Sequence, residues 1–319
     1  MTARPDGLVL RPARADELPA CADVWRAGLD GYASRVGRPP IISAPGPLAA
    51  LLAHLRRTDP DRFIVAVRPD VDGTERVVAF VSASRRDRVW FLGMLFVHPD
   101  EQARGLGRTL LEAVLPADGD SVALATCTDA AQPISNALYA RYGLVSRMPV
   151  LELVGRPDPD VPAALPGDVR AVPFELLAVG PTDGPGPRRL AEALGAMDRA
   201  TLGYAHPQDH AFLAETGRQG HLYEAGDGRI VGYGYVSPVG RIGPLAVEDA
   251  ALLPGVLGHL LRAVEPAGVF AAWVPGAAGA AVTFLLEAGL RIEDFPALLC
   301  WDRPFADFSR YLPITLGVL

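Results

Sequence analysis

The chain has 319 residues, which is longer than one typical domain, so two domains are the default expectation. Half of the residues are hydrophobic, and the formal net charge is −7 with an isoelectric point near 5.4. All 30 basic residues are arginine, and they form no basic cluster of the kind that neutralises phosphates along a nucleic acid. The composition therefore argues against nucleic acid as a partner.

Three cysteines, Cys21, Cys127 and Cys300, lie far apart and form no Cys-x-x-Cys pair. This usage is typical of a reduced, cytoplasmic protein, and the first residues lack the apolar core of a signal peptide. One uncharged run, 268–286, is long enough to raise the question of a membrane span. Because Pro275 and the glycine after it interrupt this run, we expect a strand, a turn and a helix, and no membrane partner.

The first part of the chain alternates strand and helix patterns. We expect a strand at 8–10, a helix from about residue 16, a second helix over 47–57, and a hairpin of 62–68 and 77–84 turned at 70–73. Trp25 and Tyr32 share one face of the first helix. Both the core and a substrate cleft stay open as their environment.

The stretch that organises the rest begins with an unbroken apolar run, 89–97, which predicts a strand buried on both faces. A helix follows from near Leu106, and the loop between reads Gln-Ala-Arg-Gly-Leu-Gly over 102–107. Two glycines at the start of a helix permit a tight turn, and the helix start attracts anions. The loop is therefore either a site for a phosphate-bearing ligand, with Arg104 and Arg108 able to pair with its oxygens, or a strand-to-helix turn that holds no ligand.

The order strand, Val-x-Pro, Gln-x-x-Gly-x-Gly and helix resembles motif A of the GNAT (GCN5-related N-acetyltransferase) superfamily, which in that family holds the pyrophosphate of acetyl-CoA. The segment 135–144 resembles motif B, with Tyr139 at its tyrosine and Leu144 in place of the usual phenylalanine. Gln132 stands where asparagine is usual, and Asn136 lies one helical turn later. Either could reach the pantetheine amides.

The resemblance implies an α/β (α+β) fold of two tandem GNAT domains, each with a central mixed, mostly antiparallel sheet flanked by helices. It implies direct attack of an amine on acetyl-CoA, with Tyr139 as general acid and a backbone N–H near Phe96 or Val97 as donor to the thioester oxygen. The general base stays open among Glu152, Asp129 and His98, and Tyr139 could instead be a packed helix residue. Cofactor contacts are expected from Phe96, Val97, Gln102, Ala103, Arg104, Gly105, Leu106, Gly107, Arg108, Thr109, Gln132 and Asn136, and substrate contacts from Trp25 and Tyr32.

A strand over 145–154 is expected to complete a catalytic domain, 1–155, before a stiff, proline-rich linker, 156–167. Residues 168–319 resemble a degenerate copy of that domain. Glu248 and Asp249 replace the glycine loop and would repel pyrophosphate, and Leu285 stands at the place of Tyr139. We therefore expect a degenerate GNAT-like domain that covers the first site, shapes the acceptor pocket or builds a homodimer.

Two further patterns point to other chemistry. His206 and His210 lie four residues apart and, with His221, suggest a metal site; Pro207 makes a continuous helix there less certain, and we expect no metal. We interpret Cys127 as a small core residue and not as a nucleophile. Two function classes remain: an acetyltransferase for a small-molecule or peptide amine, and a non-catalytic acetyl-CoA sensor or scaffold.

Overall fold

The computed structural model describes residues 2–3, 7–39, 45–69, 73–117, 121–161, 164–179, 181 and 183–319. The chain divides into two compact units. The first unit comprises Met1–Arg85, Val89–Thr126 and Ala131–Leu144; the second comprises Arg86–Arg88, Cys127–Ala130 and Val145–Leu319.

The first unit is built on strands in the order β1-β2-β3-β4-β5-β6. Strands β2, β3 and β4 pair antiparallel, whereas β5 and β6 run parallel. The predicted hairpin is confirmed as β3 and β4, and residues 70–72 of its turn lie outside the described residues. The strand bounds are β1 Thr2–Ala3, β2 Val9–Pro12, β3 Phe63–Pro69, β4 Glu75–Arg86, β5 Val89–Val97 and β6 Ala123–Asp129.

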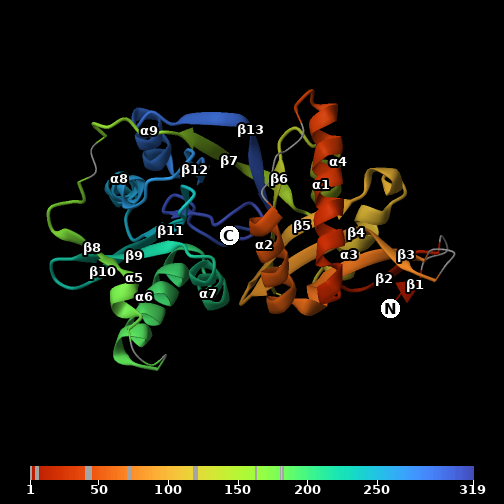
Figure 1. Cartoon of the computed structure of the whole chain (residues 1–319), viewed down its shortest axis with the longest axis horizontal. Helices are drawn as coiled ribbons and strands as arrows, with labels where there is room; N and C mark the ends of the chain where they lie inside the picture. Colours follow the sequence, from red (N-terminus) through yellow and green to blue (C-terminus); the bar gives the residue numbers. More distant parts are fainter. Residues whose placement is uncertain are drawn as a thin grey trace. The chain divides into compact units, whose positions relative to one another are not determined.

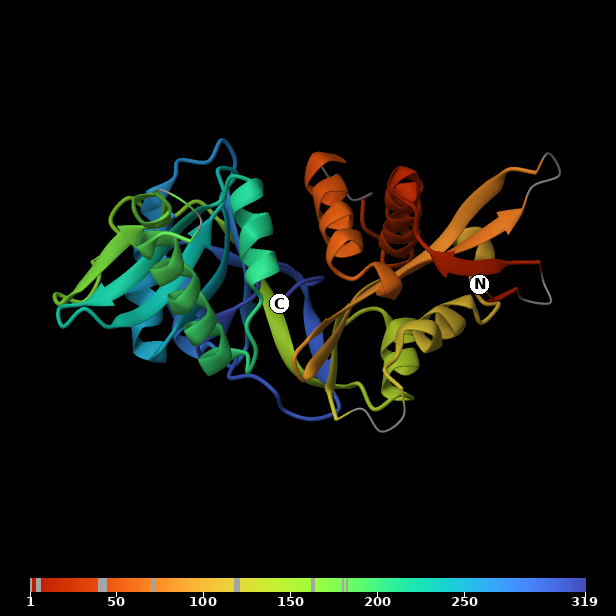
Figure 2. The same ribbon diagram turned by 90° about the horizontal axis from the view of Figure 1, so that it is seen from below.

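In the described part of this unit, α-helices cover the two faces of these strands. Figure 2 shows α1 and α2 (red and orange) on one face and α3 and α4 (gold and yellow-green) on the other. The fully buried Trp90 of β5 donates its indole N–H to the carbonyl of Val114 at 2.9 Å, which fixes the end of α3 on the sheet. The helix bounds are α1 Leu18–Arg35, α2 Pro45–Thr58, α3 Leu106–Val114 and α4 Pro133–Ala140, with 3₁₀ turns η1 Ala15–Glu17, η2 Pro60–Arg62 and η3 Pro99–Glu101.

The second unit has strands in the order β13-β7-β12-β11-β10-β9-β8. In Figure 1, α6 and α7 lie on one side of β9–β11, and α8 and α9 lie on the other. The strands are β7 Val145–Gly155, β8 Val169–Pro173, β9 Gln219–Ala225, β10 Ile230–Val236, β11 Arg241–Val247, β12 Phe270–Pro275, β13 Arg291–Trp301 and β14 Tyr311–Leu312. The helices are α5 Phe174–Leu177, α6 Pro185–Thr201, α7 Pro207–Glu215, η4 Ala250–Leu252, α8 Leu253–Ala263 and α9 Gly279–Glu287.

Strand β7 differs from the sequence expectation. We expected 145–154 to complete the first domain, but β7 belongs to the second unit. It pairs antiparallel with β12, where Glu152 faces Trp273, and antiparallel with β13, where Pro149 faces Leu298. A buried strand satisfies its backbone equally well beside any complementary edge, so the pattern that predicts a strand does not identify its partners.

The C-terminal segment lies between two strands that part. β11 and β12 are parallel neighbours only where Arg241 and Ile242 face Ala271 and Ala272. Beyond that point β14 pairs antiparallel with β11, and the N–H of Val247 donates to the carbonyl of Arg310 at 3.1 Å. Both residues of β14 are fully buried. The chain's own terminus therefore fills the space that opens beside β11.

The long uncharged run forms β12 and α9, as predicted, with a turn between them. Among the described residues, no helix combines the length and the apolar character that a membrane crossing requires.

Candidate functional site

The turn between β5 and α3 has the backbone geometry of an anion site. Gly105 is the N-cap of α3 with φ 74° and ψ 4°, and no side chain caps this helix end. Ala103, two residues earlier, also has a positive φ of 62°. Alternating left-handed residues turn successive N–H groups toward one side, and the first turn of a helix leaves its N–H groups without helical partners. Ala103, Arg104 and Gly105 are exposed, so a ligand can reach this turn from solvent.

Gln102 ties this turn to the end of β5. Its side-chain Nε2 donates to the carbonyl of Val97 at 3.0 Å. β5 pairs with β6 only as far as Leu92, so Val97 lies in the part of the strand beyond that pairing. The predicted site residues Gln102 and Val97 are thus in direct contact, next to the open helix start.

Both predicted arginines lie beside the turn, and each is paired with a carboxylate. Arg104 contacts Glu101 at 2.9 Å, and Glu101 is buried and also receives two hydrogen bonds from Arg68, at 2.9 and 2.7 Å. These bonds, with Arg68 as the main cause, hold the pKa of Glu101 below its usual value. Arg108 pairs with Glu112 at 2.9 Å. Because both guanidinium groups are more than half exposed, a phosphate can reach them from solvent.

The remaining residues of the motif A helix divide between ligand side and core. Leu106 is buried and packs inward. A Cβ added to Gly107 would meet the Leu95 side chain at 3.5 Å, an ordinary contact. The hydroxyl of Thr109 donates to the carbonyl of Gly105 at 3.2 Å and so supports the turn from behind.

Gln132 and Asn136 come together at the start of α4. Gln132 is the N-cap of this helix, and Asn136 donates its Nδ2 to the carbonyl of Gln132 at 2.8 Å. The amide of Asn136 is therefore engaged on its own helix. Tyr139, further along α4, is 6% exposed and so lies largely within the first unit.

The two aromatic residues predicted to contact substrate, Trp25 and Tyr32, lie in different environments. Trp25 of α1 packs against Phe96 of β5 with ring centroids 6.2 Å apart, and Phe96 stacks on Phe80 at 5.7 Å. Trp25 is partly exposed, whereas Tyr32 is buried. Trp25 thus lies beside β5, the strand predicted to bind the thioester. Tyr32 lies in the core, which is one of the two environments left open by the sequence.

The three candidates for the general base do not lie together in the structure. Glu152 lies in β7 of the second unit and pairs with Arg241 at 2.7 Å. Asp129 also belongs to the second unit. The ring of His98 accepts a hydrogen bond from the N–H of Asp100 at 3.4 Å. Cys127, expected in the core, is only half-buried, and all three cysteines are free.

In the second unit, the turn before α8 corresponds to the turn before α3, and a side chain of the protein itself caps it. Asp249 accepts a hydrogen bond from the N–H of Ala251 at 2.9 Å and caps the 3₁₀ turn that leads into α8. Glu248 pairs with Arg229. A hollow of about 450 Å³ between the start of α8 and the end of α9 has three carboxylates in its lining, those of Asp158, Asp160 and Glu287.

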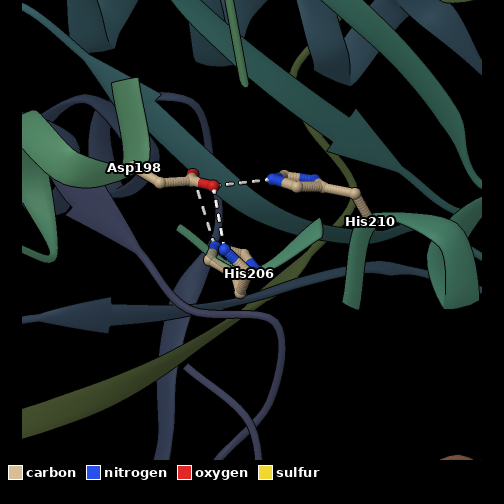
Figure 3. Close-up of side chains that lie close together, drawn as sticks. All are labelled: Asp198, His206 and His210. Atoms are coloured by element: carbon tan, nitrogen blue, oxygen red, sulfur yellow. Dashed lines mark hydrogen bonds and ion pairs between the residues drawn. The ribbon is translucent and has the colours of Figure 1, made fainter. Parts of the chain in front are cut away.

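The structure also gathers a group that the sequence analysis did not assemble. Asp198 of α6 lies with His206 and His210 in the interior of the second unit, and Figure 3 shows the three side chains directed toward one another. Pro207 is the first residue of α7 and does not interrupt it, which is where proline is tolerated in a helix. His221 lies elsewhere, with its ring beside that of His259 at 4.8 Å.

The first unit therefore combines a parallel strand pair that parts, a helix start open to phosphate, and helices on both faces of one sheet. These features define an α/β domain that presents a phosphate-binding turn at the end of its central strand. Residues 36–144 match the family model described as the acetyltransferase (GNAT) family. The chain thus contains a domain of the GNAT superfamily.

Solved structures extend this similarity to the whole chain. A Pyrococcus horikoshii protein that carries a provisional acetyltransferase assignment matches with a TM-score of 0.71 and 15% identity, over 100% of this chain and 98% of that one. A GCN5-related N-acetyltransferase from Sphaerobacter thermophilus matches at 0.59 and 21%, over 97% and 100%. A tandem GNAT protein from the clavulanic acid biosynthesis pathway matches at 0.52 and 17%, over 93% and 99%. These values show a shared mixed α/β fold; a search of curated proteins found no significant match.

Proposed function

We propose that the first unit binds acetyl-CoA and transfers its acetyl group to a primary amine. The observation that carries this proposal is the open start of α3, where Gly105 leaves the helix uncapped beside the part of β5 that no longer pairs with β6. Pyrophosphate is the part of acetyl-CoA that such a turn would hold, through backbone N–H groups and the helix dipole. The exposed guanidinium groups of Arg104 and Arg108 would turn from their carboxylate partners to phosphate oxygens.

The pantetheine arm would lie along β5 beyond Leu92, where the strand no longer pairs with β6. The N–H of His98 donates to Val78 of β4 at 2.9 Å. Because successive residues of a strand direct their N–H groups to opposite sides, the N–H of Val97 is directed away from β4. Of the two predicted donors, Val97 is therefore the one that could stabilise charge on the thioester oxygen.

Tyr139 remains our general acid for the departing thiolate. The acceptor amine would lose its proton to a water chain, since Glu152 and Asp129 belong to the second unit and the ring of His98 accepts a hydrogen bond from Asp100. The partly exposed Trp25 and its contact with Phe96 give the acceptor side an apolar wall. We propose a small-molecule or peptide amine as the acceptor. The free cysteines suit a cytoplasmic enzyme.

Three features support the proposal that the second unit is degenerate and binds no acetyl-CoA. Strand β14 occupies the space beside β11 that the arm would need. Asp249 takes an N–H group at the helix start that a phosphate would use. The hollow near α8 and α9 is lined by carboxylates, which repel pyrophosphate.

Calorimetric titration of acetyl-CoA into the full chain tests this assignment, with Gly105→Glu as the blocking variant. The matched control is Gly217→Glu, since Gly217 has nearly the same φ, 72° against 74°, and neither added Cβ would meet an atom within 4 Å. We expect a single site per chain that Gly105→Glu abolishes and Gly217→Glu retains. Two sites would contradict the degenerate second unit, and an absence of binding would contradict the enzyme.

The burial of Tyr139 supports one alternative, a non-catalytic sensor of acetyl-CoA, because a general acid must reach the thiolate. Such a protein would bind the cofactor in the same titration and release no free CoA with any amine tested. Continuous detection of the CoA thiol across an amine panel separates the two functions.

A further inference from the structure

The interior of the second unit holds a carboxylate and two imidazoles that converge on one point, independently of the acetyltransferase assignment. Asp198 and His206 are 0% exposed, and His210 is 7% exposed. One ligand atom from each of the three side chains lies within 4.8 Å of the others. The residues come from two separate segments, since Asp198 lies near the end of α6 whereas His206 and His210 flank the first turn of α7.

The spacing of these atoms suits coordination of one ion. His210 Nε2 lies 3.0 Å from Asp198 Oδ2, and His206 Nε2 lies 3.3 Å from Asp198 Oδ1. In a tetrahedral zinc site with bonds near 2.0 Å, neighbouring ligand atoms are about 3.3 Å apart. An ion could therefore bind after side-chain shifts of a few tenths of an ångström.

His206 is the residue whose environment most requires a further partner. Both of its ring nitrogens are buried and make no hydrogen bond of acceptable geometry, although carboxylates lie 3.3 and 3.6 Å away. A buried polar group without a hydrogen bond is costly, and a metal bond to Nε2 would compensate that cost.

Neighbouring groups hold each of the three side chains in the orientation that a metal ligand needs. Tyr235 contacts His210 Nδ1 at 2.8 Å, and Asp209 Oδ2 lies 3.6 Å from His206 Nδ1, so each imidazole has an oxygen at the nitrogen opposite the cluster. Tyr233 donates to Asp198 Oδ1 at 2.7 Å. Such outer contacts fix the tautomer and the direction of ligating histidines.

We propose that Asp198, His206 and His210 bind a divalent first-row transition-metal ion, with Zn²⁺ the best fit to two imidazoles and one carboxylate. The site is enclosed, so its role is structural. It joins the end of α6 to the first turn of α7 and holds both helices against β10, the strand that carries Tyr233 and Tyr235.

The rival arrangement is a buried ionic network without metal. In it, the His206 ring lies between the carboxylates of Asp198 and Asp209, while Arg86 contacts Asp209 at 3.6 Å. The two arrangements differ in what the folded protein binds, and metal analysis distinguishes them.

The test uses the untagged full chain, purified without chelators and without a metal-affinity column. Mass-spectrometric element analysis should find about one transition-metal ion per chain. After removal by a chelator, with circular dichroism confirming the fold, titration with Co²⁺ should produce visible d–d absorption bands that saturate at about one equivalent. Zn²⁺ should displace Co²⁺ and raise the melting temperature, and Mg²⁺ should do neither.

Variants locate the site within the chain. His206→Gln and Asp198→Asn should abolish the Co²⁺ bands, and Tyr235→Phe should weaken metal binding about 10- to 100-fold, because Tyr235 touches only the outer nitrogen of His210. His221→Gln is the matched control, a buried histidine outside the cluster that should bind Co²⁺ as the wild type does.

The wild-type measurements decide the proposal even where a variant fails to fold. A folded protein that contains no metal, shows no Co²⁺ bands and has the same melting temperature with and without Zn²⁺ would overturn it in favour of the ionic network. Co²⁺ bands that persist unchanged in folded His206→Gln would place the ion elsewhere and would equally overturn it.

Discussion

The side chain of Gln102 donates to the carbonyl of Val97 at 3.0 Å, so the last residue of the central strand anchors the loop that leads into α3. We expect Gln102→Ala to weaken acetyl-CoA binding about fivefold, because one neutral hydrogen bond contributes about 1 kcal/mol to the ordered loop. Calorimetry measures the change, and Gln219→Ala in the second unit is the control. Unchanged affinity would show that the loop keeps its shape without this bond.

Tyr139 and Tyr142 form a matched pair on neighbouring turns. Tyr139 is buried on α4, whereas Tyr142 is partly exposed and its hydroxyl contacts Glu112 at 2.6 Å. Tyr139→Phe should lower kcat at least about 100-fold, the usual contribution of a general acid, with no change in the Kd of acetyl-CoA. Tyr142→Phe should leave kcat within about twofold. Equal rates for wild type and Tyr139→Phe would remove Tyr139 from the mechanism.

Glu101 anchors Arg68 through two hydrogen bonds and Arg104 through one. Replacing it with glutamine removes charge-assisted bonds at a buried position, so Glu101→Gln should lower the free energy of unfolding by about 2 kcal/mol. Urea denaturation at neutral pH measures this difference. Glu112→Gln, at an exposed pair, should change stability by less than about 0.5 kcal/mol.

The same carboxylate gives a pH dependence with a defined sign. The pKa of Glu101 is lower in the folded state than in the unfolded chain, so its stabilising contribution is present above about pH 4.3 and is lost as the pH falls through the folded value. The stability difference between wild type and Glu101→Gln should be constant from pH 6 to 8 and shrink in more acidic solution. A difference that grows on acidification would contradict this assignment.

Strand β14 makes a local prediction in the second unit. Leu312 is fully buried and pairs with Leu245 of β11. Leu312→Ala should cost about 2–5 kcal/mol, as large-to-small changes in a core do, and should reduce hydrogen-exchange protection of the β11 amides. The exposed Leu286→Ala should leave that protection unchanged.

Sequence patterns located the elements around the candidate site because those signals are local. The apolar run of β5, Pro99 after it and the glycines before α3 lie within one short stretch, and each residue acts on its own neighbours. The hairpin of β3 and β4 was predictable for the same reason. The engagement of Asn136 with Gln132 was not, because an amide can serve its own helix as readily as a ligand.

Features that depend on distant residues could not be predicted. The pairing of β7 depends on β12 and β13, which lie more than a hundred residues later. Asp198 is separated from His206 by the end of a helix and a turn. The three residues therefore do not form a motif of fixed spacing that could be recognised in the sequence. In the sequence, Pro207 argued against a continuous helix through His206 and His210. Proline interrupts a helix everywhere except at its first turn, and the first turn is where Pro207 lies.

The position of β7 also bears on how the protein is made. Ribosomes add about 5 to 20 residues per second, so β7 leaves the ribosome on the order of ten seconds before β13 is complete. Until β12 and then β13 have been made, this largely apolar strand lacks its neighbours. Truncation within 156–167, where the sequence suggests a boundary, would make this state permanent: the N-terminal fragment would end in an unpaired strand prone to aggregation, and the C-terminal fragment would lack the strand that joins β12 to β13.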